Sequence, residues 1–180
     1  MLKPQECVLV VVDVQGKLAQ IMDRSDALHQ TLVNLIKGTA LFDIPTLWLE
    51  QLPDKLGPTS PVIHEVLIKS CHPIAKQHFS GWHAEQFKEQ LKGLNRKQVL
   101  LVGIEAHVCV YQTCRDLLDN GFDTHLVVDA ISSRTAANKQ LGIEMMQAQG
   151  AQITNMESLL FEFQHEAVGE RFKQLLTLIK

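Results

Sequence analysis

The chain has 180 residues, of which 46% are hydrophobic and 21% charged, as in an ordinary globular protein. A formal net charge of −3 argues against a nucleic-acid partner and against an anionic membrane surface, since both require a basic patch. The first apolar run ends at Asp13 and is too short to span a membrane, so we expect neither a signal peptide nor an anchor. The four cysteines form no framework of close pairs, which favours free thiols in a reducing, cytoplasmic compartment.

The first part of the chain predicts three strands. Residues 7–14 are nearly all valine and leucine, which is typical of a strand buried on both faces of a parallel sheet. Residues 44–49 and 71–76 predict the second and third strands. Residues 51–61 hold three prolines and a glycine and predict a loop, and residues 62–68 favour a short helix. Between the first two strands, a helix is predicted by the helical spacing of Leu28, Leu32, Leu35 and Ile36.

The second part predicts three further strands, at residues 98–103, 124–128 and 151–154, each preceded by a helix. Gly121 and Gly150 follow two of these helices and are expected to end them. Apolar residues at helical spacing mark the inward face of each helix. Before the fourth, fifth and sixth strands these faces are, in turn, Phe87, Leu91 and Leu94; Val110, Cys114, Leu117 and Leu118; and Leu141, Met145 and Ala148. The inner stripe of a C-terminal helix consists of Val168, Phe172, Leu175, Leu176 and Ile179.

This alternation predicts an α/β fold, a single three-layer, doubly wound, Rossmann-like domain over residues 1–180 with a mostly parallel six-stranded sheet. Sites in such sheets lie at the carboxyl ends of the strands, near the point where strand order reverses. Three reactive side chains occupy such positions. Asp13 closes the first predicted strand, Lys76 the third, and Cys109 follows the fourth at the start of a helix.

Together these three residues suggest nucleophilic catalysis. A helix N-terminus favours a thiolate and offers N–H groups to an oxyanion. A carboxylate could accept the thiol proton, and a lysine could hold that carboxylate charged. Each residue also has a plainer interpretation: Cys109 as inert packing, Asp13 as a turn residue or helix cap, and Lys76 as a solvated surface lysine.

At these residues the chain resembles the isochorismatase-like cysteine hydrolase family, from Val8 to about Phe161. The resemblance rests on four segments in the family's order: Val11-Val-Asp-Val-Gln15, Lys76-Gln-His-Phe-Ser-Gly-Trp82, Gly103-Ile-Glu-Ala-His-Val-Cys109 with the following Val110-Tyr-Gln-Thr113, and Val128-Asp-Ala-Ile-Ser-Ser-Arg134.

The resemblance implies a triad of catalytic residues, with Cys109 as nucleophile, Asp13 as base and Lys76 as third member. It also implies a cis peptide between Ile104 and Glu105, and an oxyanion hole formed by the backbone N–H groups of Glu105 and Cys109. The implied reaction is amidohydrolase-type: thiolate attack on an amide-type carbonyl, a thioester intermediate, and hydrolysis of a C–N bond.

One departure from the family bears on cofactors. Nicotinamidase members carry a metal-binding Asp-x-His cluster after the second strand, whereas this chain reads Trp48-Leu-Glu-Gln-Leu-Pro-Asp54 there, without histidine. We therefore expect no metal and no other cofactor, and nicotinamide is disfavoured as substrate. Leu49-Glu-Gln-Leu-Pro and Leu56-Gly-Pro-Thr59 instead resemble a subgroup of isochorismatase domain-containing proteins without established substrates.

The expected substrate pocket draws on the segments around the triad. If Glu50 faces this pocket, a cationic or amine-bearing substrate would fit better than an anionic one. Phe79 and Trp82 have an equal alternative as core or subunit-interface aromatics. The full set of expected substrate-binding residues is Gln15, Glu50, Gln51, Phe79, Trp82 and Tyr111.

Three other residue patterns could indicate a phosphatase loop, a disulfide or a zinc site, but the sequence argues against each. Cys109 and Arg115 satisfy the Cys-x5-Arg phosphatase spacing, but the segment between them lacks the glycine that helps a loop wrap a phosphate. Cys114 lies off the face of Cys109 on a helix, so no disulfide joins them in our prediction. His72, His78 and His83 surround Lys76, but their spacing matches no known zinc ligand set.

The sequence therefore predicts a cysteine-dependent hydrolase of a small-molecule, amide-like or related carbonyl substrate, assembled as a homo-oligomer of two or more subunits. A non-catalytic oligomeric binding or scaffold protein that keeps the fold is the main alternative. A reactive-thiol sensor is a third, and reversible oxidation of Cys109 would identify it.

Overall fold

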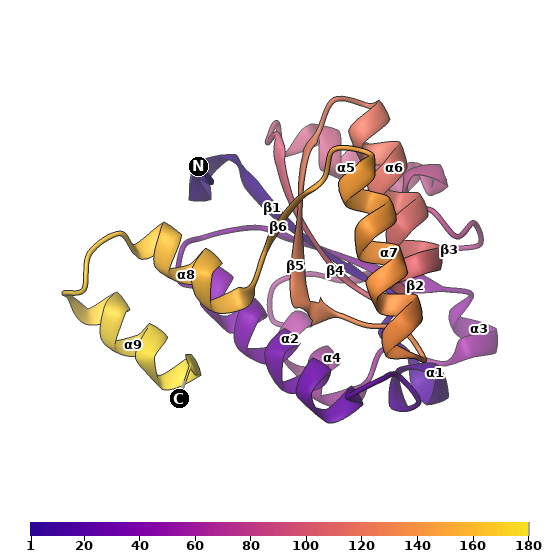
Figure 1. The fold of residues 1–180 in the computed structure, drawn as a ribbon, viewed down its shortest axis with the longest axis horizontal. Helices are drawn as coiled ribbons and strands as arrows, with labels where there is room; N and C mark the ends of the chain where they lie inside the picture. The colour runs from indigo at the N-terminus through magenta and orange to yellow at the C-terminus, as the bar shows by residue number, and fades with distance from the viewer. Residues whose placement is uncertain (180) are drawn as a thin grey trace.

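The computed structural model describes residues 1–179 and is built around one six-stranded sheet (Figure 1). Every adjacent pair of strands is parallel, and the strand order is β3-β2-β1-β4-β5-β6. The predicted α/β fold class is confirmed. The strands are β1 (Cys7–Val12), β2 (Thr46–Gln51), β3 (Pro73–Lys76), β4 (Gln98–Gly103), β5 (Asp123–Ile131) and β6 (Gln152–Thr154).

Helices cover both faces of the sheet. On one face lie α2 and α8, with α4 and α9 packed against α2, and on the other lie α5, α6 and α7 (Figure 1). Short helices α1 and α3 lie near the carboxyl ends of the strands. The helices are α1 (Gly16–Gln20), α2 (Ser25–Ala40), α3 (Pro53–Leu56), α4 (Pro61–Leu67), α5 (Glu85–Gly93), α6 (Tyr111–Asp119), α7 (Ala136–Ala148), α8 (Met156–Gln164) and α9 (Glu170–Ile179), with 3-10 turns at Pro4–Glu6 and Gly81–His83 and a π-helical turn at Ala106–Val110.

The central strand β1 explains why the sequence begins with an unbroken apolar run. All six of its residues are completely buried. Leu9 and Val11 join the core under α2 and α8, whereas Val8, Val10 and Val12 join the core under α5, α6 and α7. Because a strand covered on both faces has no solvated side, alternation of polar and apolar residues is lost.

Several strand bounds differ from the predicted ones. The first strand ends at Val12 rather than at residue 14, because Asp13 adopts a left-handed backbone with φ of 54°. The second and third strands begin later, at Thr46 and Pro73. The predicted loop at residues 51–61 contains α3, and the helix expected at residues 62–68 is confirmed as α4.

Two predicted helix faces are wrong. The buried residues of α7 are Gly142, Ile143 and Met146, because this helix approaches the Ala106–Val110 turn through Gly142. The C-terminal stripe was expected to be buried, yet only Leu175 of α9 is, and Val168 is 65% exposed. The separate helix α8 was not predicted. Within residues 1–179, no helix is both long and apolar enough to cross a membrane.

Candidate active site

The carboxyl ends of β1, β3 and β4 bring together the three reactive residues that the sequence singled out. The sheet reverses its strand order at β1, which pairs with β2 on one side and with β4 on the other. Asp13 follows β1, and its backbone N–H donates to the Leu49 carbonyl of β2 at 3.2 Å. Residues separated by up to 96 positions in the sequence therefore meet at one edge of the sheet, as parallel topology requires.

Lys76 is a buried ion-pair partner of Asp13 and not a solvated surface lysine. Its Nζ lies 2.6 Å from Asp13 Oδ2, and the two side chains are 0% and 3% exposed. Nζ also donates to Gln51 Oε1 at 2.6 Å, which follows from the register that pairs Gln51 with Lys76. The carbonyls of His78 and Phe79 accept further hydrogen bonds, at 3.2 Å and 2.9 Å. These partners offset the cost of burying the charge.

Cys109 lies in the π-helical turn that leads into α6 and is 9% exposed. Burial raises the pKa of its thiol to about 12, the Asp13 carboxylate beside it also raises that pKa, and Lys76 lowers it. The direction of this shift is opposite to the thiolate that the sequence suggested a helix N-terminus would favour. At rest, a neutral thiol faces a carboxylate.

Asp13 has one carboxylate oxygen free to act on that thiol. Oδ2 is bound to Lys76, whereas the buried Oδ1 has no hydrogen-bond partner within residues 1–179 that meets the usual geometry. Burial raises the pKa of the Asp13 carboxyl, and the Lys76 charge opposes that rise. A carboxylate with a raised pKa is a stronger base, which suits a group that accepts a proton from a thiol.

The turn that carries Cys109 is anchored by the segment after β5. The backbone N–H of Ala106 donates to the Ser132 carbonyl at 2.9 Å and to Ser133 Oγ at 3.0 Å. Glu105 Oε2 accepts from the backbone N–H and the Nε of Arg134, at 3.3 Å and 3.1 Å. The peptide between Ile104 and Glu105 is cis, as the family resemblance implied.

Two glycines let the backbone close around this turn. Gly103 has φ of +117°, and a Cβ there would lie 2.1 Å from the carbonyl oxygen of Val12. A Cβ on Gly142 would lie 2.6 Å from the carbonyl carbon of Ala106. A side chain at either position would displace backbone, so both glycines set the position of the cysteine turn.

Asp13 and Cys109 share a small, largely apolar cavity of about 110 Å³. Gln51 and Glu105 complete its polar lining. The apolar lining residues are Leu18, Leu56, Phe79, Ile104 and Val108. Phe79, which is 54% exposed, lies at the mouth. Such a cavity can hold a small carbonyl compound against the thiol.

Two of the expected substrate-binding residues, Gln51 and Phe79, line this cavity, and two others have structural contacts instead. The buried Gln15 donates through Nε2 to the Gly57 carbonyl and accepts at Oε1 from the Gln51 backbone, which ties the α3 segment to β2. Glu50 Oε1 accepts from both the backbone N–H and the hydroxyl of Thr59, at 2.8 Å and 2.7 Å. Neither Gln15 nor Glu50 is brought to the cavity.

The remaining two expected residues also lie elsewhere. Trp82 is buried in the core under α5 and α6, with its ring 5.9 Å from that of Phe122. Tyr111 begins α6 and does not line the cavity. For Trp82 the alternative interpretation as a core aromatic fits its position.

Sequence reasoning missed most of the apolar cavity wall. Leu18 and Leu56 come from the short helices α1 and α3, which were not predicted. Ile104 and Val108 flank catalytic candidates in the sequence and could have been found by that proximity. An isolated leucine in a loop carries no signal that separates a cavity wall from ordinary packing.

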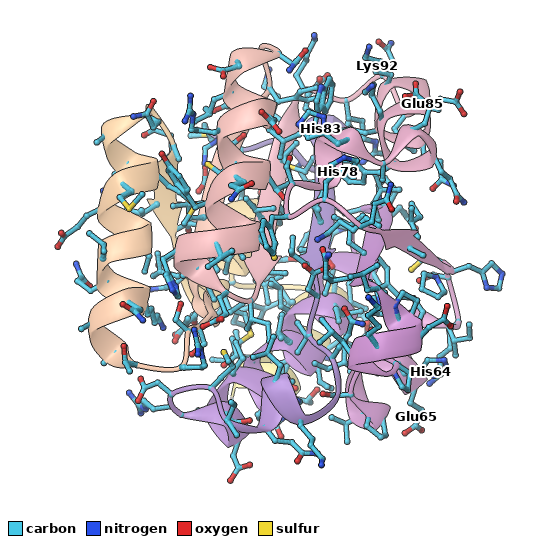
Figure 2. The ribbon with its side chains drawn as sticks, turned by 90° about the vertical axis from the view of Figure 1, so that its right-hand side faces the viewer. His64, Glu65, His78, His83, Glu85 and Lys92 are labelled. Atoms are coloured by element: carbon cyan, nitrogen blue, oxygen red, sulfur yellow. The ribbon has the colours of Figure 1, made fainter. Side chains whose placement is uncertain are left out.

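The other side-chain groups that the sequence raised do not form sites. His78 and His83 lie side by side, with ring centroids 5.3 Å apart (Figure 2). Within residues 1–179, no group of three or more histidine, cysteine or acidic side chains could hold a metal ion. Arg115 is exposed on α6 and outside the cavity, so the phosphatase arrangement does not form. All four cysteines are free.

Comparison with known proteins places this chain in a family. The family model for the isochorismatase domain matches residues 7–158. The human isochorismatase domain-containing protein 2 is 34% identical over 98% of this chain and 84% of its own length. The secreted isochorismatase effector Isc1 of Phytophthora sojae is 35% identical over 98% of this chain and 86% of its own length.

Solved structures agree on the fold. The MAR1 ribonuclease of Caenorhabditis elegans superposes with a TM-score of 0.90 and 35% identity, covering 99% of this chain and 91% of that one. The YcaC protein of Escherichia coli, described as an octameric hydrolase of unknown specificity, superposes with a TM-score of 0.91 at 20% identity over 98% of this chain and 89% of that one.

Proposed function

The chain belongs to the isochorismatase family, and we propose that it is a cysteine-dependent amidohydrolase that cleaves a small amide-like or related carbonyl compound. The observation that carries this proposal is the buried Asp13–Lys76 ion pair, in which Asp13 lines the same cavity as Cys109 and keeps Oδ1 without a hydrogen-bond partner among residues 1–179. A binding or scaffold protein has no need to bury an ion pair beside a thiol, because burial of charge is costly.

In the proposed acylation step, Asp13 Oδ1 accepts the Cys109 proton as the sulfur attacks the substrate carbonyl. The proton then moves from Asp13 to the leaving amine, the C–N bond breaks, and a thioester on Cys109 remains. Lys76 is the ion-pair partner that offsets the charge of the Asp13 carboxylate. Gln51 and the carbonyls of the 78–79 loop hold the ammonium in place.

In the proposed deacylation step, Asp13 accepts a proton from water, which attacks the thioester. The carboxylic acid leaves and the proton returns to the Cys109 sulfur, which restores the resting thiol. In both steps the backbone N–H groups of Glu105 and Cys109 are the proposed donors to the oxyanion. The anchors of this turn on Ser132 and Ser133 would keep those donors in fixed positions.

We further propose the setting in which this chemistry occurs. The four free thiols favour a reducing, cytoplasmic compartment, although the relative in Phytophthora sojae is named a secreted effector. We propose one domain over residues 1–180 and a homo-oligomer, an arrangement consistent with the octamer described for YcaC. The proposed partner is a small-molecule substrate, without nucleic acid or membrane.

The name of the Caenorhabditis elegans relative raises ribonuclease activity as a second function. The net charge of −3 and a small, mainly apolar cavity argue against it here, because RNA binding relies on basic and stacking surfaces. RNA cleavage that persists in the Cys109→Ala variant would nevertheless favour this function over the proposed one.

The test is turnover of a panel of small amides and esters, with the acyl-enzyme trapped at low pH and located by peptide mass spectrometry. Wild type should hydrolyse at least one compound and carry the acyl group on Cys109. Cys109→Ala should lose activity by about 10³-fold or more. Cys114→Ala is the matched control, since Cys114 is also buried and lies outside the cavity, and it should retain activity. Equal turnover by the Cys109→Ala variant would disprove the proposal.

A further inference from the structure

We infer that the cavity at Cys109 selects an uncharged substrate with a short aliphatic acyl group, an inference that rests on the proposed function for its reaction but not for its binding. The inference rests on two observations: the charged side chains around the cavity are already paired, and most of its lining residues are apolar. The preference for an uncharged ligand can be tested by alkylation of Cys109 without any substrate, and the preference for chain length by substrate turnover.

A substrate anion would find no free cation in this cavity. Among residues 1–179, no lysine, arginine or histidine lines it. Lys76 lies behind Asp13 and has three N–H donors, but it already has four acceptors, at 2.6, 2.6, 3.2 and 2.9 Å. A carboxylate bound beside Cys109 would therefore be buried without a counter-ion, which is unfavourable.

The acidic side chains around the cavity are already engaged by cations or hydrogen-bond donors, so a substrate cation would have to compete with those partners. Asp13 is neutralised by Lys76 at 2.6 Å. The second carboxylate of the lining, Glu105, is held by Arg134 at 3.1 Å. Glu50, which would have favoured an amine if it faced the pocket, is instead engaged by Thr59. Asp13, Glu105 and Glu50 thus each have a partner already, although Asp13 Oδ1 itself is unpaired among residues 1–179, and a neutral ligand leaves these pairs intact.

The walls favour a small aliphatic group over a large one. The cavity volume of about 110 Å³ is well below the roughly 300–1,000 Å³ of typical ligand pockets. Its five apolar side chains come from separate segments: the short helices α1 and α3, the 77–80 loop, the residue that follows β4, and the π-helical turn that carries Cys109. A short hydrocarbon chain next to the carbonyl would be buried against these side chains, whereas a long chain would extend beyond the cavity.

The first experiment compares alkylating agents of equal size and different charge at Cys109. Iodoacetamide is neutral, iodoacetate is anionic, and 2-bromoethylamine is cationic. Each rate at Cys109 in the native protein is divided by the rate of the same peptide in urea-unfolded protein at the same pH. We expect this ratio to be about tenfold or more higher for iodoacetamide than for either charged reagent. Equal ratios, or no reaction of Cys109 with any reagent, would overturn the inference.

The second experiment measures kcat/KM along a series of neutral aliphatic amides of increasing chain length, with anionic and cationic amides as comparisons. Leu56→Ala should shift the preferred chain length upward by enlarging the cavity. Leu141→Ala is the matched control, because Leu141 is a similarly exposed leucine on α7 outside the cavity. An unchanged preference in Leu56→Ala, or a preference for a charged amide, would contradict the inference.

The two experiments separate the inference from the proposed function. Charge selection in alkylation without hydrolysis of any amide would uphold the neutral cavity and refute the hydrolase. Hydrolysis through Cys109 with no preference for neutral compounds would uphold the hydrolase and refute the selection.

Discussion

The Lys76 ammonium lies 2.6 Å from the Asp13 carboxylate in a place where both side chains are almost completely shielded from solvent. The pair is electrically neutral as a unit, yet it leaves Asp13 Oδ1 without a partner within residues 1–179. The thiol of Cys109 adjoins that carboxylate, which raises the thiol pKa. A proton can therefore move from sulfur to oxygen without any change in the net charge of the three groups.

Replacing Asp13 with asparagine should separate thiol acidity from catalysis. The Asp13 carboxylate raises the pKa of Cys109 and the Lys76 charge lowers it, so Asp13→Asn should move the thiol pKa downward from about 12. Hydrolysis should nevertheless fall by about 10²–10⁴-fold, because the proton acceptor is lost. The measurements are Cys109 alkylation rate against pH and turnover of one amide. An alkylation midpoint that stays or rises would contradict this account.

Removing the Lys76 charge should destabilise the fold. Lys76→Met would leave the Asp13 carboxylate buried without a counter-ion, at a cost of about 3–5 kcal/mol in the free energy of unfolding. The double variant Asp13→Asn/Lys76→Met should recover most of that loss but remain inactive. Urea unfolding measures both effects. Lys173→Met, which removes an exposed partner of Glu170, should change stability by less than about 1 kcal/mol. Additive losses in the double variant would refute the coupling.

Alkaline pH should weaken the fold through its buried thiols. Burial raises the pKa of Cys7, Cys109 and Cys114 from 9.0 to about 12. Between these values the unfolded chain binds fewer protons than the native one, so the free energy of unfolding falls as pH rises. Each raised pKa unit corresponds to about 1.4 kcal/mol for a fully realised shift. Stability measured against pH should decline less steeply in Cys114→Ala than in wild type, and parallel curves would count against the shift.

Adding a methyl group to Gly142 should disturb the nucleophile turn. The new Cβ would lie 2.6–2.7 Å from backbone atoms of Ala106 and His107, so α7 or the turn must move. We expect a loss of about 1–3 kcal/mol in stability and a clear fall in kcat, read from urea unfolding and amide turnover. Gly93→Ala is the control, because Gly93 also lies in a helix and its added Cβ meets nothing within 4 Å. Equal effects of the two substitutions would exclude a special role for Gly142.

The sequence by itself determined the fold class and the three reactive residues. The apolar run of β1 predicts a strand covered on both faces, and the order of strands and helices predicts a doubly wound sheet. Because parallel strands end at one edge, side chains that follow them must lie near one another, which singled out Asp13, Lys76 and Cys109. Periodicity was less informative for α7 and α9, where contacts with other elements, and not the apolar pattern, decide which residues are buried.

Only the tertiary structure decided the charge state and the shape of the site. A sequence does not show that Lys76 has four acceptors, that Glu50 is bound by Thr59, or that Asp13 keeps one oxygen free. These facts depend on which segments pack across the strand ends, and packing there involves short loops with no periodic pattern. The physical reason is that local sequence sets strand and helix formation, whereas desolvation and hydrogen-bond pairing in a cavity depend on residues distant in the chain.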